Sequence, residues 1–260
     1  MASSDGNKWK TAITSIQPNE VRLRGFRLDQ LMGKVSFGQA VYLALRGEMP
    51  TQEAGELIEA ILVACIDHGA TPPSVLACRT SASTGAPLNA ALCAGILSIN
   101  RLHGGAIEDA MNFFYEHASS ISDADVASRA LEAAAALKNA GKKASGYGHR
   151  IHTDDPRTAR LVAMARERGL AGKYVNFAVA FESGLAQVTG RKLPLNVDGA
   201  IAAVLCDLGF DSKLANAFFI MARVTGLTAH YFEETTREKP MRNVTPGAHE
   251  YDGPPPRDIS

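Results

Sequence analysis

Apolar residues at helical spacing recur along most of this chain, and this periodicity limits the fold more than any other feature. In residues 52–66 the apolar side chains stand three and four positions apart, which gives a helix one apolar face. The sequence predicts further helices over residues 87–101, 105–117, 124–140, 173–189, 197–209 and 213–235. Asp155 followed by Pro156 predicts another helix start, because proline suits the first helical position. A mostly helical, all-α fold follows.

Only residues 11–31 indicate β structure. Short β-prone stretches flank the turn Pro18-Asn19, which predicts a hairpin near the N-terminus. At the other end, residues 240–260 hold five of the twelve prolines, and we expect an irregular tail there. The chain is therefore expected to add one short β-hairpin to an otherwise helical fold.

Charge and composition exclude several classes of protein. Lys plus Arg and Asp plus Glu both number 27, so no basic excess points to nucleic acid or to an anionic membrane. The first ten residues are polar, and no run approaches 18 apolar residues. The four cysteines form no close pair, which is typical of reduced thiols. We expect a cytoplasmic protein that binds neither nucleic acid nor membrane.

Four separate segments place charged or imidazole side chains beside a glycine or at a helix start. They are Asp67-His68-Gly69, the stretch LHGGA at 102–106, GYGHR at 146–150 with DPR at 155–157, and LNVDG at 195–199. Together they supply histidines, a carboxylate and arginines, which are the groups needed to make or break a carbon–carbon bond next to a thioester.

These segments resemble motifs of the citrate synthase superfamily. The shared order is LHGGA, then GYGHR followed by DPR, then NVDG, and the resemblance runs from about residue 8 to about residue 245. The opening QPNEVRLRG, the stretch DHGATPPS and the ending MARVTGLTAHYFEE are similar to citryl-CoA lyases and to the lyase module of ATP-citrate lyase. The resemblance implies a citrate-synthase-like fold. It divides the chain into a large helical domain (1–103 and 209–260) and a small inserted domain (104–208).

The resemblance implies catalytic roles for Asp198, His103 and His149. Asp198 would move a proton at the carbon next to the thioester, although a first-turn aspartate taken alone more often serves the helix dipole. His103 would hydrogen-bond the thioester oxygen as a neutral imidazole, and its alternative is a buried histidine at a glycine junction. His149 would exchange the proton of the substrate hydroxyl. His149 and His152 lack a third ligand nearby, so a metal site is the weaker interpretation.

Other residues are implied to hold the substrates. Guanidinium forks suit dicarboxylates, although a surface arginine taken alone is usually only solvated. The substrate-binding residues implied are His68, Arg157, Arg223 and Arg242, and the last would act in the neighbouring subunit of a homodimer or larger homo-oligomer. For coenzyme A the implied residues are Lys142, Lys143, Gly146, Tyr147, Gly148 and Arg150. His68 and the two lysines also suit helix C-termini, so this structural interpretation stays open for them.

The activity implied is that of a citryl-CoA lyase, which cleaves citryl-CoA to acetyl-CoA and oxaloacetate with no permanently bound cofactor. One alternative is a citrate or 2-methylcitrate synthase of tricarboxylic acid metabolism. His103 keeps this alternative open, because lyase modules can depart from histidine at that position. A subunit that needs a citryl-CoA synthetase partner and a non-catalytic helical interaction subunit are also consistent with the resemblance.

Overall fold

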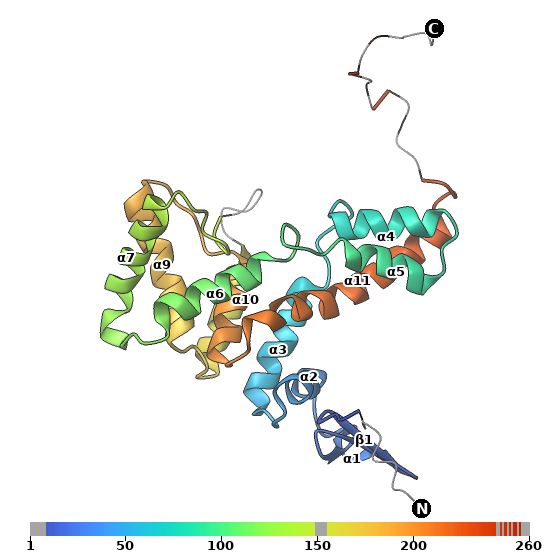
Figure 1. Cartoon of the computed structure of the whole chain (residues 1–260), viewed down its shortest axis with the longest axis horizontal. Coiled ribbons are helices and arrows are strands. Elements are labelled where there is room, and N and C mark those ends of the chain that lie inside the picture. The colour runs from blue at the N-terminus through green and yellow to red at the C-terminus, as the bar shows by residue number, and fades with distance from the viewer. Residues whose placement is uncertain are drawn as a thin grey trace, which may run out of the picture. The chain divides into compact units, whose positions relative to one another are not determined.

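The computed structural model describes residues 9–148 and 155–242 and a few positions of the tail beyond them. Helices dominate these residues, and the only sheet among them is small, antiparallel and close to the N-terminus (Figure 1). The predicted all-α fold with an N-terminal hairpin is therefore confirmed.

The elements follow in chain order. The strands are β1 (Thr14–Gln17), β2 (Glu20–Leu23) and β3 (Phe26–Arg27), paired in the order β1-β2-β3. The helices are α1 (Leu28–Leu31), α2 (Phe37–Arg46), α3 (Gln52–Cys65), α4 (Pro73–Ser83), α5 (Leu88–Leu97), α6 (Ala106–Ala118), α7 (Val126–Asn139), α8 (Pro156–Glu167), α9 (Lys173–Thr189), α10 (Val197–Asp207) and α11 (Ala215–Arg237), with 3-10 turns η1 (Asp123–Asp125) and η2 (Ser212–Leu214).

The structure adds elements that the periodicity did not predict. Helix α2 begins at a capping box in which the hydroxyl of Ser36 accepts from the backbone of Gln39 and the side-chain amide oxygen of Gln39 accepts from the backbone of Ser36. Helix α4 begins at Pro73, because proline at the first helical position needs no backbone N–H. Strand β3 adds a third strand to the predicted hairpin.

Contacts divide the chain into two units. The first comprises Met1–Asp67 and Ile99–Arg223, and the second comprises His68–Ser98 and Val224–Ser260. The large and small domains predicted from the sequence have other limits than these two units. The predicted domains are segments expected to move together in a catalytic cycle, and they stay a prediction.

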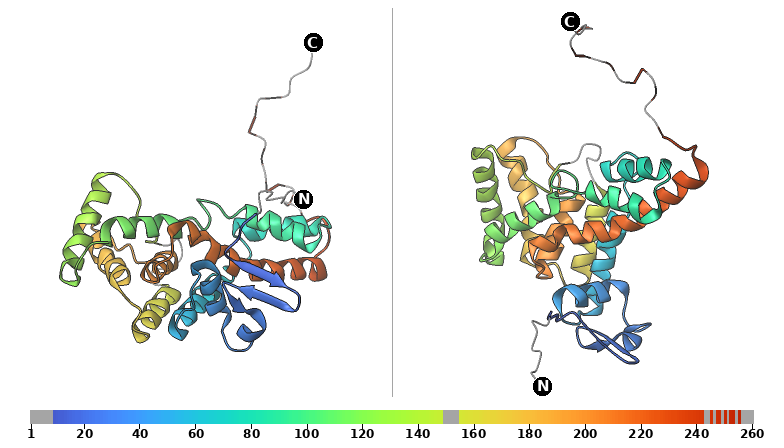
Figure 2. Two further views of the ribbon diagram at one scale, coloured as in Figure 1. Left: turned by 60° about the horizontal axis from the view of Figure 1, so that its bottom comes forward. Right: turned by 45° about the vertical axis from the view of Figure 1, so that its right-hand side comes forward.

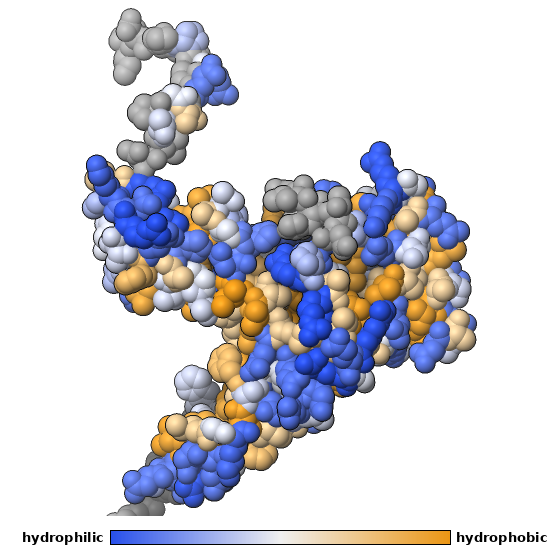
Figure 3. Space-filling model, turned by 180° about the vertical axis from the view of Figure 1, so that it is seen from behind, coloured by the Kyte–Doolittle hydropathy of each residue, from blue (hydrophilic) through white to orange (hydrophobic). Residues whose placement is uncertain are grey.

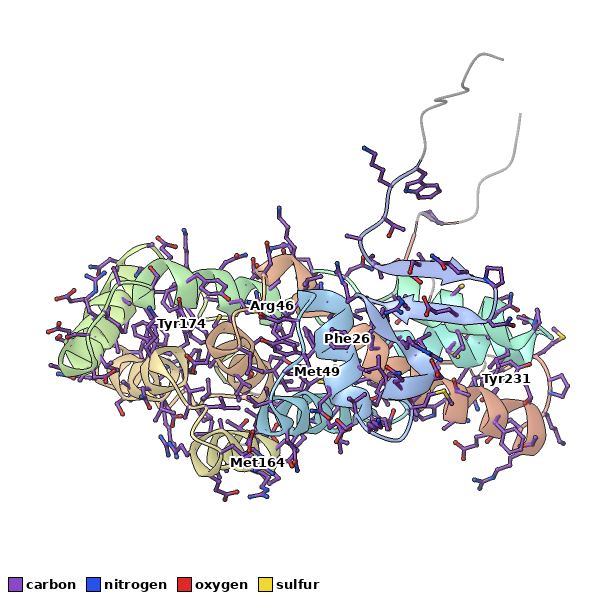
Figure 4. The ribbon with its side chains drawn as sticks, turned by 90° about the horizontal axis from the view of Figure 1, so that it is seen from below. Phe26, Arg46, Met49, Met164, Tyr174 and Tyr231 are labelled. Carbon is purple, nitrogen blue, oxygen red and sulfur yellow. The ribbon has the colours of Figure 1, made fainter. Side chains whose placement is uncertain are left out.

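The first unit is built around α10. Every residue of α10 from Gly199 to Cys206 is buried, as expected for a helix surrounded on all sides. Helices α6, α8 and α9 pack against it, and α7 lies along α9 (Figures 1 and 2). The ring of Phe177 stacks on that of Phe181 with centroids 5.8 Å apart. Tyr174 on α9, labelled in Figure 4, makes an edge-to-face contact with the ring of Tyr115 on α6. This core holds the N-terminus of α10 in place.

The second unit packs α4, α5 and the second part of α11 around a smaller core. Gly95 permits this packing, because a side chain there would meet Cδ1 of Leu227 at 2.8 Å and the carbonyl oxygen of Ser74 at 2.9 Å. Tyr231, labelled in Figure 4, packs against the same core. The small residues of the predicted helix 87–101 therefore do allow close helix packing.

The surface mixes polar and apolar side chains. Figure 3 shows hydrophobic patches among hydrophilic residues, and several large apolar side chains are well exposed in the described residues. None of the described helices is long and apolar enough to span a bilayer. Among the described residues, no group of three or more histidine, cysteine or acidic side chains is placed to hold a metal ion.

Candidate active site

Two of the predicted motifs are joined by backbone contacts in the first unit. The amide of Asn196 donates to the carbonyl of Gly146 (2.9 Å), and its side chain donates to the carbonyl of Gly148 (2.8 Å). A Cβ on Gly199 would lie only 2.4 Å from the carbonyl oxygen of Gly146, so that position requires glycine. The GYG segment is thereby fixed against the first turn of α10, next to Asp198.

Asp198 lies in the first turn of α10, where the side chain of Asn196 caps the helix by accepting from the backbone of Gly199 at 3.1 Å. Burial raises the pKa of the Asp198 carboxyl. The guanidinium groups of Arg157 and Arg223 oppose this shift, while the negative charge of Asp155 adds to it. Burial therefore makes the carboxylate of Asp198 more basic than that of an exposed aspartate, which suits a group that takes or delivers a proton at carbon.

Arg157 bridges the start of α8 and the end of α3. Its Nε and Nη2 donate to the two carboxylate oxygens of Asp155 at 3.0 and 2.8 Å, and Nη1 donates to the carbonyl of Ala64 at 3.2 Å. Asp155 also caps α8 by accepting from the backbone of Arg157. The hydrogen bonds to Asp155 raise the pKa of Arg157. This guanidinium is thus fixed in place by its own helix N-cap.

Arg223 is a buried cation on α11. Its Nε donates to the carbonyl of Cys65 at 3.2 Å, and its guanidinium carbon lies 4.7 Å from the ring centroid of Phe219. Nη1 is buried and has no hydrogen-bond partner among the described residues. Burial lowers the pKa of the guanidinium, and the charge of Asp67 opposes this shift. A buried donor without a partner is costly, and an anionic ligand would satisfy it.

His103 lies between α5 and α6, in a tight turn that its backbone closes with two hydrogen bonds to Asn100. Its ring meets the ring of Phe219 edge to face, with centroids 5.7 Å apart. Burial, and then the charge of Arg223, lower the pKa of the imidazole. His103 is therefore kept neutral, as the predicted hydrogen-bond donor to a thioester oxygen requires.

The remaining predicted residues fall into two groups. His149 and Arg150 lie outside the described residues. His68 and Arg242 belong to the second unit, where Nε and Nη2 of Arg242 donate to Glu234 at 2.8 and 2.7 Å. Their roles at the site remain predictions.

A cavity of about 600 Å³ lies in the first unit, between α6, α7 and the segment that leads to the GYG motif. Lys142 and Lys143 line it, and Phe113 and Phe181 supply apolar surface. Tyr147 is not part of the lining, and its hydroxyl donates to the carbonyl of Ala178 at 2.8 Å. Of the predicted coenzyme A residues, the two lysines therefore line a cavity, and Tyr147 anchors the loop.

Comparison with known proteins bears directly on this arrangement. The chain matches the family model "Citrate synthase, C-terminal domain" over residues 51–243. The chain belongs to the citrate synthase family. Its fold matches citryl-CoA lyase from Hydrogenobacter thermophilus with a TM-score of 0.90 and 44% identity, covering 97% of both chains.

Two further relatives are less similar to this chain. ATP citrate lyase from Methanothrix soehngenii, solved with citrate and coenzyme A, shares the fold with a TM-score of 0.82 and 23% identity over 96% of this chain and 42% of its own. ATP-citrate synthase beta chain protein 1 of Arabidopsis thaliana is 31% identical over 206 residues, which are 72% of this chain. The chain spans about a third (32%) of the length of that relative.

Sequence reasoning missed two contacts of this citrate synthase family site. Phe219 joins His103 to Arg223 through its ring, yet it stands in an apolar helix where nothing marks it. Asp155 stands out in the sequence as the residue before Pro156, which indicates a helix cap. The signal did not show that its carboxylate also holds Arg157.

Proposed function

We propose that the chain is a citryl-CoA lyase, which cleaves citryl-CoA to acetyl-CoA and oxaloacetate. The observation that carries this proposal is the buried Arg223, whose Nη1 lacks a partner among the described residues in a cluster that also influences Asp198. Such an arrangement suits a substrate with a carboxylate and an acidic carbon. The 44% identity to the Hydrogenobacter thermophilus enzyme supports the choice of lyase.

In the cleavage direction, His149 takes the hydroxyl proton of citryl-CoA. The electrons of the O–H bond form the ketone of oxaloacetate, and the broken carbon–carbon bond leaves its electron pair on the thioester as an enolate. Neutral His103 donates a hydrogen bond to the enolate oxygen. Protonated Asp198 then delivers its proton to carbon, which gives acetyl-CoA. The raised pKa of Asp198 lowers the free-energy cost of protonating its carboxylate before this last step.

The carboxylates of the oxaloacetate half would be held by Arg157, Arg223 and His68, with Arg242 acting from a second copy of the chain. Guanidinium groups suit this task because they bind a carboxylate with two parallel hydrogen bonds. We therefore propose a homodimer or larger homo-oligomer that works in the cytoplasm.

Coenzyme A would be substrate and product rather than a resident cofactor. Lys142 and Lys143 line a cavity whose size suits part of the nucleotide and could bind its phosphates, and Gly146, Gly148 and Arg150 would complete the contacts. The solved complex of the Methanothrix soehngenii relative contains citrate and coenzyme A, which supports this ligand class.

A citrate or 2-methylcitrate synthase is the second candidate, and His103 favours it, because a neutral donor at the thioester serves condensation equally well. A subunit that works with a citryl-CoA synthetase, or a non-catalytic interaction subunit, would also be consistent with the fold. The clustering of Arg157, Arg223 and Asp198 argues against the last, since a scaffold has no need to bury charges together.

Two incubations separate these candidates. Purified protein is given synthetic citryl-CoA in one, and acetyl-CoA with oxaloacetate in the other. Release of oxaloacetate from the first supports the lyase, and release of free coenzyme A thiol with citrate from the second supports the synthase. Silence in both, repeated with a citryl-CoA synthetase present, would overturn an enzymatic function.

A further inference from the structure

Asp155 and Arg157 form the most completely bonded charge pair near Asp198. The carboxylate of Asp155 accepts three hydrogen bonds from Arg157, one from its backbone and two from the Nε and Nη2 edge of its guanidinium. A two-point contact of this kind fixes the plane of the guanidinium as well as its position.

The two partners differ in exposure. The side chain of Asp155 is 2% exposed, whereas that of Arg157 is 28% exposed. The carboxylate therefore faces the protein interior and the guanidinium extends towards accessible space.

The hydrogen bonds of Arg157 leave donors for a ligand. A guanidinium carries five N–H donors. Among the described residues, Nε and Nη2 each give one to Asp155 and Nη1 gives one to the carbonyl of Ala64. Of the five donors, one on Nη1 and one on Nη2 have no acceptor among the described residues, and these can bind a second carboxylate.

Arg223 shows that a two-point carboxylate contact is not required to keep an arginine at this site. Within the described residues it is held by the carbonyl of Cys65 and the ring of Phe219. The paired contact with the carboxylate of Asp155 is therefore a feature specific to Arg157.

We propose that Asp155 is a positioning residue of the active site, whose carboxylate orients Arg157 so that its remaining Nη1 and Nη2 donors bind a carboxylate of oxaloacetate. The proposal rests on the proposed function. Asp155 does not touch the substrate and acts through Arg157.

The charge of Asp155 has a second effect in the same cluster. The groups that influence the carboxyl of Asp198 are Arg157 and Asp155 at the start of α8 and Arg223 on α11, and the buried thiol of Cys65 lies within reach on α3. The negative charge of Asp155 raises the pKa of Asp198, against the effect of the two arginines. Removal of that charge alone would therefore lower the pKa of Asp198.

The test is Asp155→Asn, with kinetics in the condensation direction, where the two substrates can be varied separately. Asparagine still caps a helix, but its amide nitrogen cannot accept from Nη2. We expect the KM for oxaloacetate to rise about tenfold or more, because a hydrogen bond to a charged group is lost, with the KM for acetyl-CoA within about twofold of wild type. In a plot of kcat against pH, the fall in kcat on the acidic side should move to lower pH, because ionised Asp198 is the base in this direction and its pKa is lowered.

Asp211→Asn is the matched control, since Asp211 caps η2 by accepting from a backbone N–H two residues on, and is exposed. Its KM for oxaloacetate and its KM for acetyl-CoA should both stay at wild-type values. The double variant of Asp155→Asn with Arg157→Met should have an oxaloacetate KM no higher than Arg157→Met alone, because Asp155 acts through Arg157. If Asp155→Asn does not fold, Asp155→Glu keeps the charge but displaces the guanidinium, and the oxaloacetate KM should again rise.

The outcomes are separable. Wild-type silence with both substrate sets overturns the proposed function and the positioning role together. An active wild type whose Asp155 variants keep the oxaloacetate KM within about twofold overturns the positioning role alone. Strictly additive effects in the double variant would do so as well, since they would show that Asp155 acts independently of Arg157.

Discussion

Each of the two units contains a group of charged side chains, and the two groups are satisfied in opposite ways. In the second unit, buried Glu234 accepts from Nε of Arg79 at 2.6 Å and from two nitrogens of Arg242. In the first unit, Nη1 of buried Arg223 is without a partner among the described residues. The group in the second unit is complete, while the group in the first unit has a donor ready for an anion.

This difference separates a carboxylate that the protein itself satisfies from a guanidinium that it leaves incompletely bonded. Hydrogen bonds from Arg242, and then from Arg79, lower the pKa of Glu234, so its ionised form stabilises the fold. Burial shifts the pKa values of Arg223 and Asp198 against their charged forms. The charges of Arg223 and Asp198 therefore cost stability, and a bound substrate would offset that cost.

The largest effect should come from Asp198→Asn. We expect kcat to fall at least about a thousandfold, because a positioned acid or base commonly contributes a factor of about 10² to 10⁴. Thermal stability should be equal or higher at neutral pH, since a carboxyl with a raised pKa costs stability once it ionises. Oxaloacetate release and a thermal unfolding curve measure both, and near-normal turnover would remove Asp198 from the mechanism.

Arg223→Met should follow in size, with a fall of about a hundredfold in kcat/KM, because a buried bond to a substrate carboxylate is lost. Methionine fills similar volume without a charge, so the unfolding midpoint should not fall. A clear loss of stability with unchanged kinetics would show that Arg223 is structural and that the comparison between the units is wrong.

Arg79→Met should lower stability and leave activity unchanged, which is the reverse of the effect expected for Arg223→Met. One of the two cations bound to Glu234 is lost, and breaking a buried pair typically costs about 3 kcal/mol of unfolding free energy. The kcat of the folded protein should stay within about twofold of wild type. Denaturant unfolding beside kinetics would test this, and Arg237→Met, at an exposed ion pair on the same helix as Glu234, is the control with an expected change below about 1 kcal/mol.

Low pH should destabilise the second unit because it protonates Glu234. Its pKa lies below the ordinary value of 4.5, so the stabilisation is full above about pH 4.5 and is lost as pH falls through the lowered pKa. Glu234→Gln should be less stable than wild type at about pH 7 and should lose less stability than wild type below about pH 4.5. Parallel acid-unfolding curves of the two proteins would contradict this.

The smallest effect should come from the cavity lysines. Lys142→Ala or Lys143→Ala should raise the KM for the coenzyme A thioester a few-fold, because exposed lysines contribute weakly to phosphate binding. Lys192→Ala, at an exposed lysine that is not part of the cavity lining, should leave it unchanged. Equal effects of all three would place the coenzyme A phosphates elsewhere.

Much of the fold could be predicted because local signals were strong. The helix over residues 173–189 was predicted at its observed bounds, since Gly190 ends it in the left-handed conformation that glycine favours. Short helices such as α4 were missed, because Pro73 was interpreted as a break rather than as a first helical residue.

Less of the candidate active site than of the fold could be predicted from the sequence. Asp198, His103, Arg157 and Arg223 were identified only by resemblance, since each alone has a structural explanation. The contacts that give them their properties, such as Arg223 with the carbonyl of Cys65, join residues far apart in the chain. No local pattern encodes such a contact.

The last turn of α3 holds two of the arginines with main-chain atoms alone, through the adjacent carbonyls of Ala64 and Cys65. A helix end leaves such carbonyls without intrahelical partners, and they carry partial negative charge. These acceptors therefore do not depend on the chemistry of the side chains at the two positions. A scan of single substitutions, or a list of invariant residues, would pass over this part of the site.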